Sequence, residues 1–254
     1  MVDTLTKLSN RVWQMRAGTP TPFSEFTLRL EDIEQSDYPG RCAEIFFAND
    51  KEAVHKWVHY LPIYDRIFSP YVGQPLRFLE IGVFRGGSMN MWREFFGSEA
   101  TIFGIDVDPK CAAYNGISGQ VRIGSQDDPA FLRSVVEEMG GVDIVLDDGS
   151  HIASHQRASF GALFPLLSDG GLYVIEDLHS AYWPSYEGGV RRPGTGIEFL
   201  KNKIDEMHQH YMRPGLNTAD RIPAIDNIRF FDSIAVIEKR QQQPRGCVIV
   251  PPPT

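Results

Sequence analysis

Cysteines, basic clusters and long apolar runs are all scarce in this sequence of 254 residues. Its three cysteines, Cys42, Cys111 and Cys247, lie far apart and form no CxxC pair. This arrangement is typical of a reducing compartment, and it argues against a disulfide framework and a zinc–thiolate site. The formal net charge of -8 argues against a nucleic-acid partner held by phosphate contacts.

No stretch of the chain approaches the ~18 apolar residues that a membrane-spanning helix needs. The first residues, MVDTLTKLSNRVW, also lack the apolar core of an export signal. We therefore expect a cytoplasmic protein without a membrane span.

Short β-rich runs alternate with helical patterns from about residue 76 onward. Continuous apolar strands with helices between them indicate a parallel sheet covered on both faces. The chain therefore predicts an α/β fold with a mostly parallel, doubly wound, Rossmann-like sheet and a C-terminal antiparallel strand pair. The expected strands are 76–83, 101–107, 120–125, 142–148, 172–178, 228–231 and 234–239, and the expected helices are 88–96, a segment from Pro129, 155–167 with a stop near Gly170 and Gly171, and 197–211.

A single core of this size accounts for most of the chain. We expect residues 71–240 to form it, with residues 1–70 as a partly helical lead-in that packs on the core or on a partner subunit. Residues 241–254 are expected to be a C-terminal tail.

A glycine-rich turn follows the first expected strand, in the order Glu80, Gly82, Gly86, Gly87 and Ser88. Glycines at such a turn let backbone amides approach a ligand closely, although they also serve in ordinary tight turns. The spacing differs from the GxGxxG of dinucleotide-binding proteins. The acid before the first glycine would repel a pyrophosphate and would favour a cationic ligand.

Asp106 ends the second expected strand, about twenty residues after the glycines, where an acid receives the two ribose hydroxyls in nucleoside-binding α/β folds. The alternative is a helix cap before Pro109. Ser125, Gln126 and Asp127 follow the third strand and could contact an adenine, unless Asp127 or Asp128 simply caps the next helix. Asp128 before Pro129 is expected to be the N-cap of that helix.

Two pairs of acids end the fourth and fifth strands: Asp147 with Asp148, and Glu176 with Asp177. Neighbouring parallel strands lie about 4.8 Å apart, so the four carboxylates would converge. Left unpaired, they would repel each other, and no run of Lys or Arg stands nearby in the sequence to neutralise them. A divalent cation would solve this problem, and an all-oxygen set favours Mg²⁺, Mn²⁺ or Ca²⁺ over zinc. Helix N-capping is the alternative for each acid alone.

His151 and His155 form an H-x-x-x-H pair that could hold zinc if both lay on one helix. Gly149 and Ser150 make the first histidine a loop residue instead, which disfavours this pair as a zinc site.

Four motifs together resemble the class I S-adenosylmethionine-dependent O-methyltransferases that modify sugar hydroxyls. The motifs are E-x-G-x-x-x-G-G-S, GIDVD, LDDGSH and IEDLHSAYW, and the resemblance covers roughly residues 50–240 with NDKEAVHKWVHYLPIYD near its start. Metal-dependent enzymes of macrolide-sugar tailoring and of mycobacterial glycan and glycolipid methylation are the most similar members. The resemblance implies a Rossmann-like class I methyltransferase fold, S-adenosylmethionine and Mg²⁺, with Mn²⁺ as a possible substitute.

The resemblance also implies a role for each matched position. Asp148, Glu176 and Asp177 would be the metal ligands and His151 the general base. The residues that would hold the cofactor are Glu80, Gly82, Ser88, Asp106, Gln126 and Asp147.

This chemistry suits the residue types. The sulfonium of S-adenosylmethionine is a cation, so it is compatible with an acid near the glycine turn. A sugar hydroxyl is a very weak acid, so a bound Mg²⁺ would help it lose its proton, and an imidazole can accept a proton at neutral pH. His179 would either support the metal ligands or pack in the core.

The acceptor is expected to be a glycoside of a macrolide, a glycolipid or an oligosaccharide. Tyr182, Trp183 and Tyr186 could stack on a pyranose, with Arg191 and Arg192 as hydrogen-bond donors, or these side chains could merely pack the loop 180–196 onto the domain. We expect a homo-oligomer.

Three other functions compete with this interpretation. A NAD-dependent oxidoreductase would also use Asp106, but it is disfavoured by the missing GxGxxG and by the acid cluster. A metal-dependent hydroxylase is the second alternative, because some similar proteins carry a hydroxylase label. A catalytically idle nucleoside-binding protein would need neither His151 nor the acids.

Overall fold

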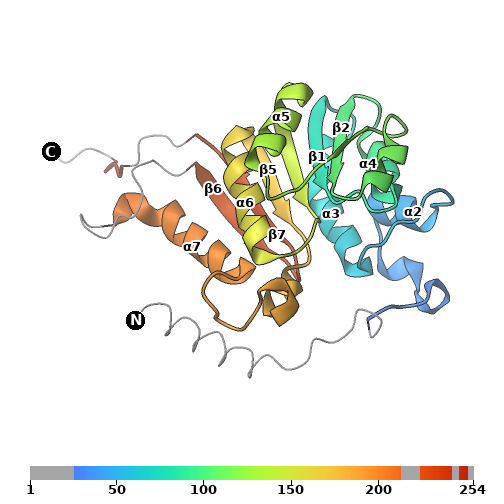
Figure 1. Cartoon of the computed structure of the whole chain (residues 1–254). Coiled ribbons are helices and arrows are strands. Elements are labelled where there is room, and N and C mark those ends of the chain that lie inside the picture. Colours follow the sequence, from blue (N-terminus) through green and yellow to red (C-terminus); the bar gives the residue numbers. More distant parts are fainter. Residues whose placement is uncertain (1–25, 213–223, 242–245, 251–254) are drawn as a thin grey trace.

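The computed structural model describes residues 26–212, 224–241 and 246–250. A seven-stranded sheet in the order β3-β2-β1-β4-β5-β7-β6 runs through its centre (Figure 1). The first five strands are parallel, whereas β7 pairs antiparallel with both β5 and β6. The strands are β1 (Leu76–Ile81), β2 (Ala100–Asp106), β3 (Gln120–Ile123), β4 (Val142–Asp147), β5 (Leu167–Ile175), β6 (Ile225–Phe230) and β7 (Ala235–Lys239).

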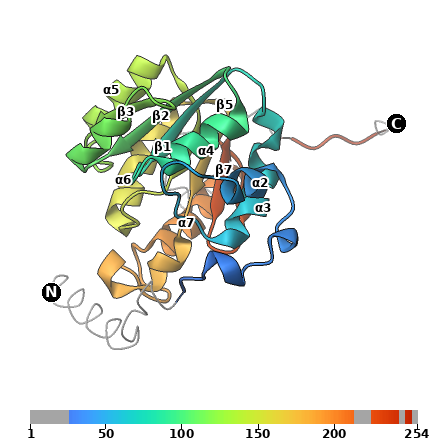
Figure 2. The same cartoon turned by 90° about the vertical axis from the view of Figure 1, so that its right-hand side faces the viewer.

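Helices cover both faces of the sheet, as the two views show (Figures 1 and 2). One apolar cluster joins α2, α3 and α4 to one face, and a second joins α5, α6 and α7 to the other. Side chains alternate along β1, so that Phe78 enters the first cluster while Leu79 enters the second. The helices are α2 (Arg41–Phe47), α3 (Leu61–Phe68), α4 (Gly87–Phe96), α5 (Pro129–Met139), α6 (Ala153–Leu163) and α7 (Gly196–His208).

The predicted α/β fold is confirmed, including the mostly parallel sheet and the antiparallel C-terminal pair. The predicted N-cap of α5 is also present, because Asp128 accepts hydrogen bonds from the amides of Ala130 and Phe131. The predicted end of α6 near Gly170 and Gly171 is wrong. The helix ends at Leu163, a 3-10 turn with Pro165 follows, and both glycines lie inside β5.

The segment before β1 packs directly on the sheet. Tyr64 and Phe68 of α3 are fully buried against Trp92 of α4, with ring centroids 5.1 and 5.5 Å from the indole. Aromatic side chains contribute large buried areas and favourable edge-to-face contacts. This packing holds α3 beside the carboxyl ends of β4 and β5, which matters for the site below.

Among the described residues, no helix is both long and apolar enough to cross a membrane.

Candidate active site

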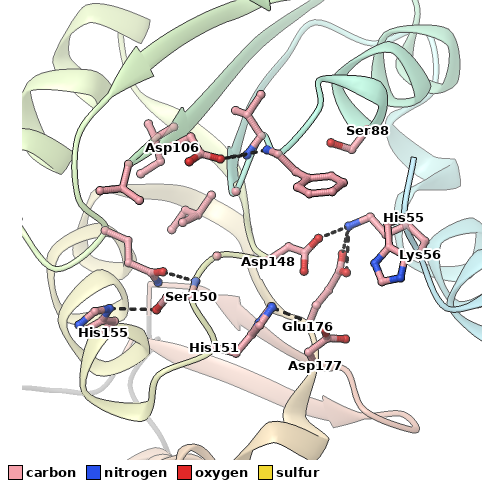
Figure 3. A pocket seen from close by; sticks show the side chains of 18 of the residues that line it. His55, Lys56, Ser88, Asp106, Asp148, Ser150, His151, His155, Glu176 and Asp177 are labelled. Atoms are coloured by element: carbon pink, nitrogen blue, oxygen red, sulfur yellow. Dashed lines mark hydrogen bonds and ion pairs between the residues drawn. The ribbon is translucent and has the colours of Figure 1, made fainter. Parts of the chain in front are cut away.

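A cavity of about 520 Å³ opens at the carboxyl ends of β1, β2, β4 and β5 (Figure 3). The strand order reverses between β1 and β4, and ligands of open α/β sheets bind at such a switch point. The predicted site residues that line the cavity are Gly82, Ser88, Asp106, Gln126, Asp148, His151, Glu176, Asp177 and Tyr186.

The glycine turn after β1 forms one wall of this cavity. Gly82 has φ +97°, and a Cβ there would lie 2.2 Å from the carbonyl oxygen of Asp148. Gly87 begins α4 so close to the carbonyl of Ala53 that a Cβ would lie 2.4 Å from it. Both positions therefore require glycine, and of the two Gly82 borders the cavity.

Asp106 fastens this turn from the end of β2. Its Oδ2 accepts hydrogen bonds from the amides of Val83 and Phe84 at 3.0 and 2.9 Å, and its Oδ1 accepts one from the amide of Asp108 at 2.8 Å. The carboxylate borders the cavity. A ribose could still reach it, because each carboxylate oxygen has more than one acceptor position.

Glu80 lies behind the cavity wall. Its carboxylate is fully buried and accepts hydrogen bonds from the indole of Trp92 at 3.0 Å and from the hydroxyl of Ser88 at 2.8 Å. Burial raises the pKa of Glu80 to about 7, against the lowering effect of Lys56 and of these two donors. Of these residues, Ser88 faces the cavity, so Glu80 would act on a cofactor through Ser88.

Asp147 also points away from the cavity, although Asp148 next to it points in. Asp147 is fully buried and accepts hydrogen bonds from Ser159, Tyr173 and the Nε2 of Gln126. Any contribution of Asp147 to cofactor binding is therefore indirect, through the position of the Gln126 amide at the cavity wall.

Two of the other three acids, Asp148 and Glu176, contact a lysine from far upstream. The Nζ of Lys56 lies 2.5 Å from Asp148 Oδ2 and 3.0 and 2.9 Å from the two oxygens of Glu176 (Figure 3). Tyr64 donates a hydrogen bond of 2.6 Å to Glu176, and Tyr60 donates one of 2.7 Å to Asp177. The sequence shows no run of Lys or Arg near these acids, but a single lysine 92 residues before Asp148 neutralises part of their charge.

Burial dominates the electrostatics of this group. It raises the pKa of Glu176 well above the usual range, and the repulsion of Asp148 adds to the rise while Lys56 opposes it. Burial alone would lower the pKa of Lys56, but the carboxylates of Asp148 and Glu176 outweigh it and raise that pKa. The ammonium therefore stays charged.

His151 faces the same acids from the loop after β4. Its Nε2 lies 3.5 Å from Asp177 Oδ2, and its Nδ1 has no hydrogen-bond partner among the described residues. Both His151 and Asp177 have positive φ, at 57° and 54°. Such backbone strain in residues other than glycine is concentrated at functional sites.

A divalent cation fits this arrangement. One ligand atom each from Asp148, His151 and Asp177 lies within 4.8 Å of the others. Carboxylate oxygens suit Mg²⁺ or Mn²⁺. The predicted ligand Glu176 stands beside this group, with both oxygens engaged by Lys56.

Of the remaining predicted residues, His155 lines the cavity. His155 contacts Ser150 at 2.9 Å and Asp127 at 3.6 Å, and it does not join the potential metal ligands. His179 contacts the hydroxyl of Ser233 at 2.6 Å, and burial lowers its pKa. Tyr182, Trp183 and His179 are not among the described residues that line the cavity.

Sequence reasoning missed Lys56, Tyr60 and Tyr64 as parts of the site. Their regular spacing of four residues was the available signal, because on a helix it would place the three polar groups on one side. In the structure only Tyr64 of the three lies in α3. Nothing local in the sequence connects that segment to acids more than ninety residues later.

The comparisons with known proteins agree with this geometry. A family model described as a methyltransferase domain matches residues 79–178. The 8-demethyl-8-(2-methoxy-alpha-L-rhamnosyl)-tetracenomycin-C 3'-O-methyltransferase of Streptomyces olivaceus is 40% identical over 208 residues, which are 76% of this chain and 51% of that protein. The mycinamicin VI 2''-O-methyltransferase of Micromonospora griseorubida is 39% identical over 207 residues, which are 74% of this chain and 49% of that protein.

Among solved structures, the MycE methyltransferase from the mycinamycin biosynthetic pathway, in complex with Mg and SAH, superposes with a TM-score of 0.70. It is 34% identical, and the match covers 83% of this chain and 55% of that one. The chain thus spans about half the length of the curated relatives it matches. Residues 79–178 thus match a methyltransferase domain, in a chain that has the class I methyltransferase fold and is similar over about three quarters of its length to sugar O-methyltransferases.

Proposed function

We propose that this protein transfers a methyl group from S-adenosylmethionine to a sugar hydroxyl of a glycoside, with the help of Mg²⁺. One observation carries the proposal: a single cavity is bordered by the glycine turn with Asp106 on one side and by Asp148, His151 and Asp177 on the other. A nucleoside cofactor and a metal-assisted hydroxyl would therefore meet inside it.

The cofactor side uses polar groups that the fold already holds in place. Asp106 would accept the ribose hydroxyls, and the exposed backbone after Gly82 would border the amino-acid portion. Gln126 donates to Asp147 and accepts from the amide of Ser150 at 2.6 Å, so its amide is fixed at the cavity wall for an adenine.

The acid side would hold the cation and the reacting hydroxyl. Asp148 and Asp177 would be ligands, with Glu176 beside them. When bound, the cation supplies positive charge that makes a sugar hydroxyl easier to deprotonate.

His151 would act as the general base through Nε2. The 3.5 Å distance from Nε2 to Asp177 is too long for a strong hydrogen bond, so this nitrogen remains available for the hydroxyl proton. The adjacent carboxylate would stabilise the imidazolium that forms. Methyl transfer would then leave S-adenosylhomocysteine, a methyl ether and a proton on His151.

The acceptor would approach past Tyr186, whose ring centroid is 6.2 Å from that of His151. Tyr186 is thus placed to stack on the sugar, whereas Tyr182 and Trp183 would act farther out. Homologues that methylate rhamnosyl and macrolide glycosides support a glycoside as the acceptor class. We propose a cytoplasmic homo-oligomer.

The test is a methyl-transfer assay on a panel of rhamnosides and macrolide glycosides, read by mass spectrometry as the gain of one methylene unit. Turnover should require S-adenosylmethionine, stop after exhaustive chelation and return with Mg²⁺. Full activity in the chelated enzyme would contradict the metal's role. Oxidation of the acceptor with NAD in place of methylation would favour the oxidoreductase.

A further inference from the structure

Lys56 is an unusual residue for a metal site, because it brings a second cation to the acids. Its side chain is only 2% exposed, and its ammonium contacts three carboxylate oxygens of Asp148 and Glu176. The ammonium also lies 5.9 Å from the ring centroid of Tyr64. A lysine buried to this extent is expected only where paired charges hold it.

The contacts of Lys56 divide the carboxylate oxygens into two groups. Both oxygens of Glu176 and the Oδ2 of Asp148 are engaged by the ammonium. The Oδ1 of Asp177 accepts from Tyr60. Among the described residues, the Oδ1 of Asp148, the Oδ2 of Asp177 and the Nε2 of His151 have no short hydrogen bond, and these three residues form the potential ligand group.

The segment that carries Lys56 has no regular secondary structure to hold it. Residues 53–57 form part of the cavity wall between α2 and the turn before α3. Ala53 packs closely on Gly87, Val54 and Trp57 pack on the apolar core, and Lys56 forms ion pairs with the acids. The ammonium is therefore the charged contact that joins this wall to the acids.

We propose that Lys56 is the internal counter-cation of the acid cluster and that it opposes binding of the divalent cation through Asp148, the carboxylate that belongs to both groups. Without a metal, the ammonium neutralises acids that would otherwise repel each other in a buried site. With a metal, the ammonium and the metal would both border Asp148, and their repulsion weakens metal binding. This inference rests on the divalent-cation site of the proposed function.

The test compares metal affinity in Lys56→Met, Lys56→Arg and the parent by titration calorimetry with Mn²⁺, in the absence of cofactor and acceptor. Lys56→Met removes the charge and keeps an apolar side chain of similar length, whereas Lys56→Arg keeps the charge. Lys51→Met is the matched control, because Lys51 lies shortly before this segment but pairs on the surface with Glu94 at 2.7 Å.

We expect Lys56→Met to bind Mn²⁺ roughly tenfold more tightly or better, since a unit of positive charge leaves a poorly solvated site. Lys56→Arg and Lys51→Met should stay within about twofold of the parent. In thermal unfolding without metal, Lys56→Met should have a lower Tm than the parent, because the acids then repel each other. Saturating Mn²⁺ should raise the Tm of Lys56→Met by more than it raises that of the parent.

Unchanged affinity in Lys56→Met would overturn the proposal. Weaker binding would overturn it too, because it would make Lys56 a support for the ligands. If Lys56→Met does not fold, the same comparison is made in the Glu176→Gln background, where the lysine still contacts Asp148. There, loss of Lys56 should again tighten Mn²⁺ binding, and an unchanged or weaker affinity would overturn the proposal.

A parent protein that binds no divalent cation overturns this inference whether or not it methylates glycosides. Conversely, the competition can be measured in a protein that methylates none of the glycosides tested, so the two failures are distinguishable.

Discussion

The replacement His151→Asn separates the roles of base and metal ligand at the same position. The structure leaves both roles open to the imidazole, because His151 faces Asp177 and also joins the potential ligand group. The backbone of His151 has φ 57°. Asparagine tolerates this left-handed conformation, whereas alanine would add a strain of ~1–2 kcal/mol. His151→Asn therefore removes the base while it preserves the loop.

The expected loss follows from the role of the group. A positioned general base contributes ~10²–10⁴-fold, which is ~2.7–5.5 kcal/mol of transition-state stabilisation. Asparagine cannot accept the proton, so kcat should fall by about this factor. Binding of Mg²⁺ and of S-adenosylhomocysteine should change little, because Asp148 and Asp177 remain and the cofactor wall is not touched.

Three measurements together decide whether His151 is a general base or a metal ligand. Steady-state kinetics at saturating Mg²⁺ give the loss of kcat, and calorimetry gives the affinity for Mn²⁺ and for S-adenosylhomocysteine. The pH–rate profile gives an independent check, since the parent should gain activity as its base deprotonates and His151→Asn should lack that limb.

Recovery of His151→Asn at high Mg²⁺ would refute the reasoning. In that case the imidazole would be a ligand whose loss only weakens the metal. A large loss of Mn²⁺ affinity without a change in the pH profile would lead to the same conclusion.

Three further predictions concern the walls of the cavity. In calorimetry, Asp106→Asn should bind S-adenosylhomocysteine ~10–100-fold more weakly, because it loses charge-assisted hydrogen bonds to the ribose; unchanged affinity would contradict the cofactor assignment. Tyr64→Phe removes a 2.6 Å hydrogen bond to buried Glu176 and should lower the free energy of unfolding in urea by ~1.5–3 kcal/mol, whereas an unchanged midpoint would argue against that bond. In the folded protein the pKa of Glu80 is about 7, against 4.5 in the unfolded chain, so the folded state holds more protons between these pH values and loses stability as the pH rises through them. Between pH 4.5 and 7 the parent should therefore lose roughly 3 kcal/mol of its free energy of unfolding in denaturant titrations, and Glu80→Gln should not show this loss. An equally steep pH dependence in Glu80→Gln would show that Glu80 does not cause it.

The sequence determined the parallel core and the location of the site within it. Alternation of apolar strands with helices predicts a doubly wound sheet, and such a sheet gathers the ends of its strands at one edge. Asp106, Asp148 and Glu176 each follow a strand, so their meeting in one cavity could be predicted without coordinates.

The tertiary structure decided which acids face the cavity. Successive side chains of a strand point to opposite faces, so small differences at a strand end separate neighbours. Asp147 turns into the core toward Ser159 and Tyr173, while Asp148 turns into the cavity. In the sequence the two neighbouring aspartates look equivalent, so the sequence cannot tell which of them faces the cavity.

The tertiary structure also decided how the acids are neutralised. Lys56 reaches Asp148 and Glu176 because α3 packs its aromatic side on α4 and sets the preceding segment against the sheet. A contact of this kind depends on the packing of distant apolar side chains, and no local pattern in the sequence encodes it. The location of the acid cluster could therefore be predicted from the sequence, whereas the neutralisation of its charges depended on the fold.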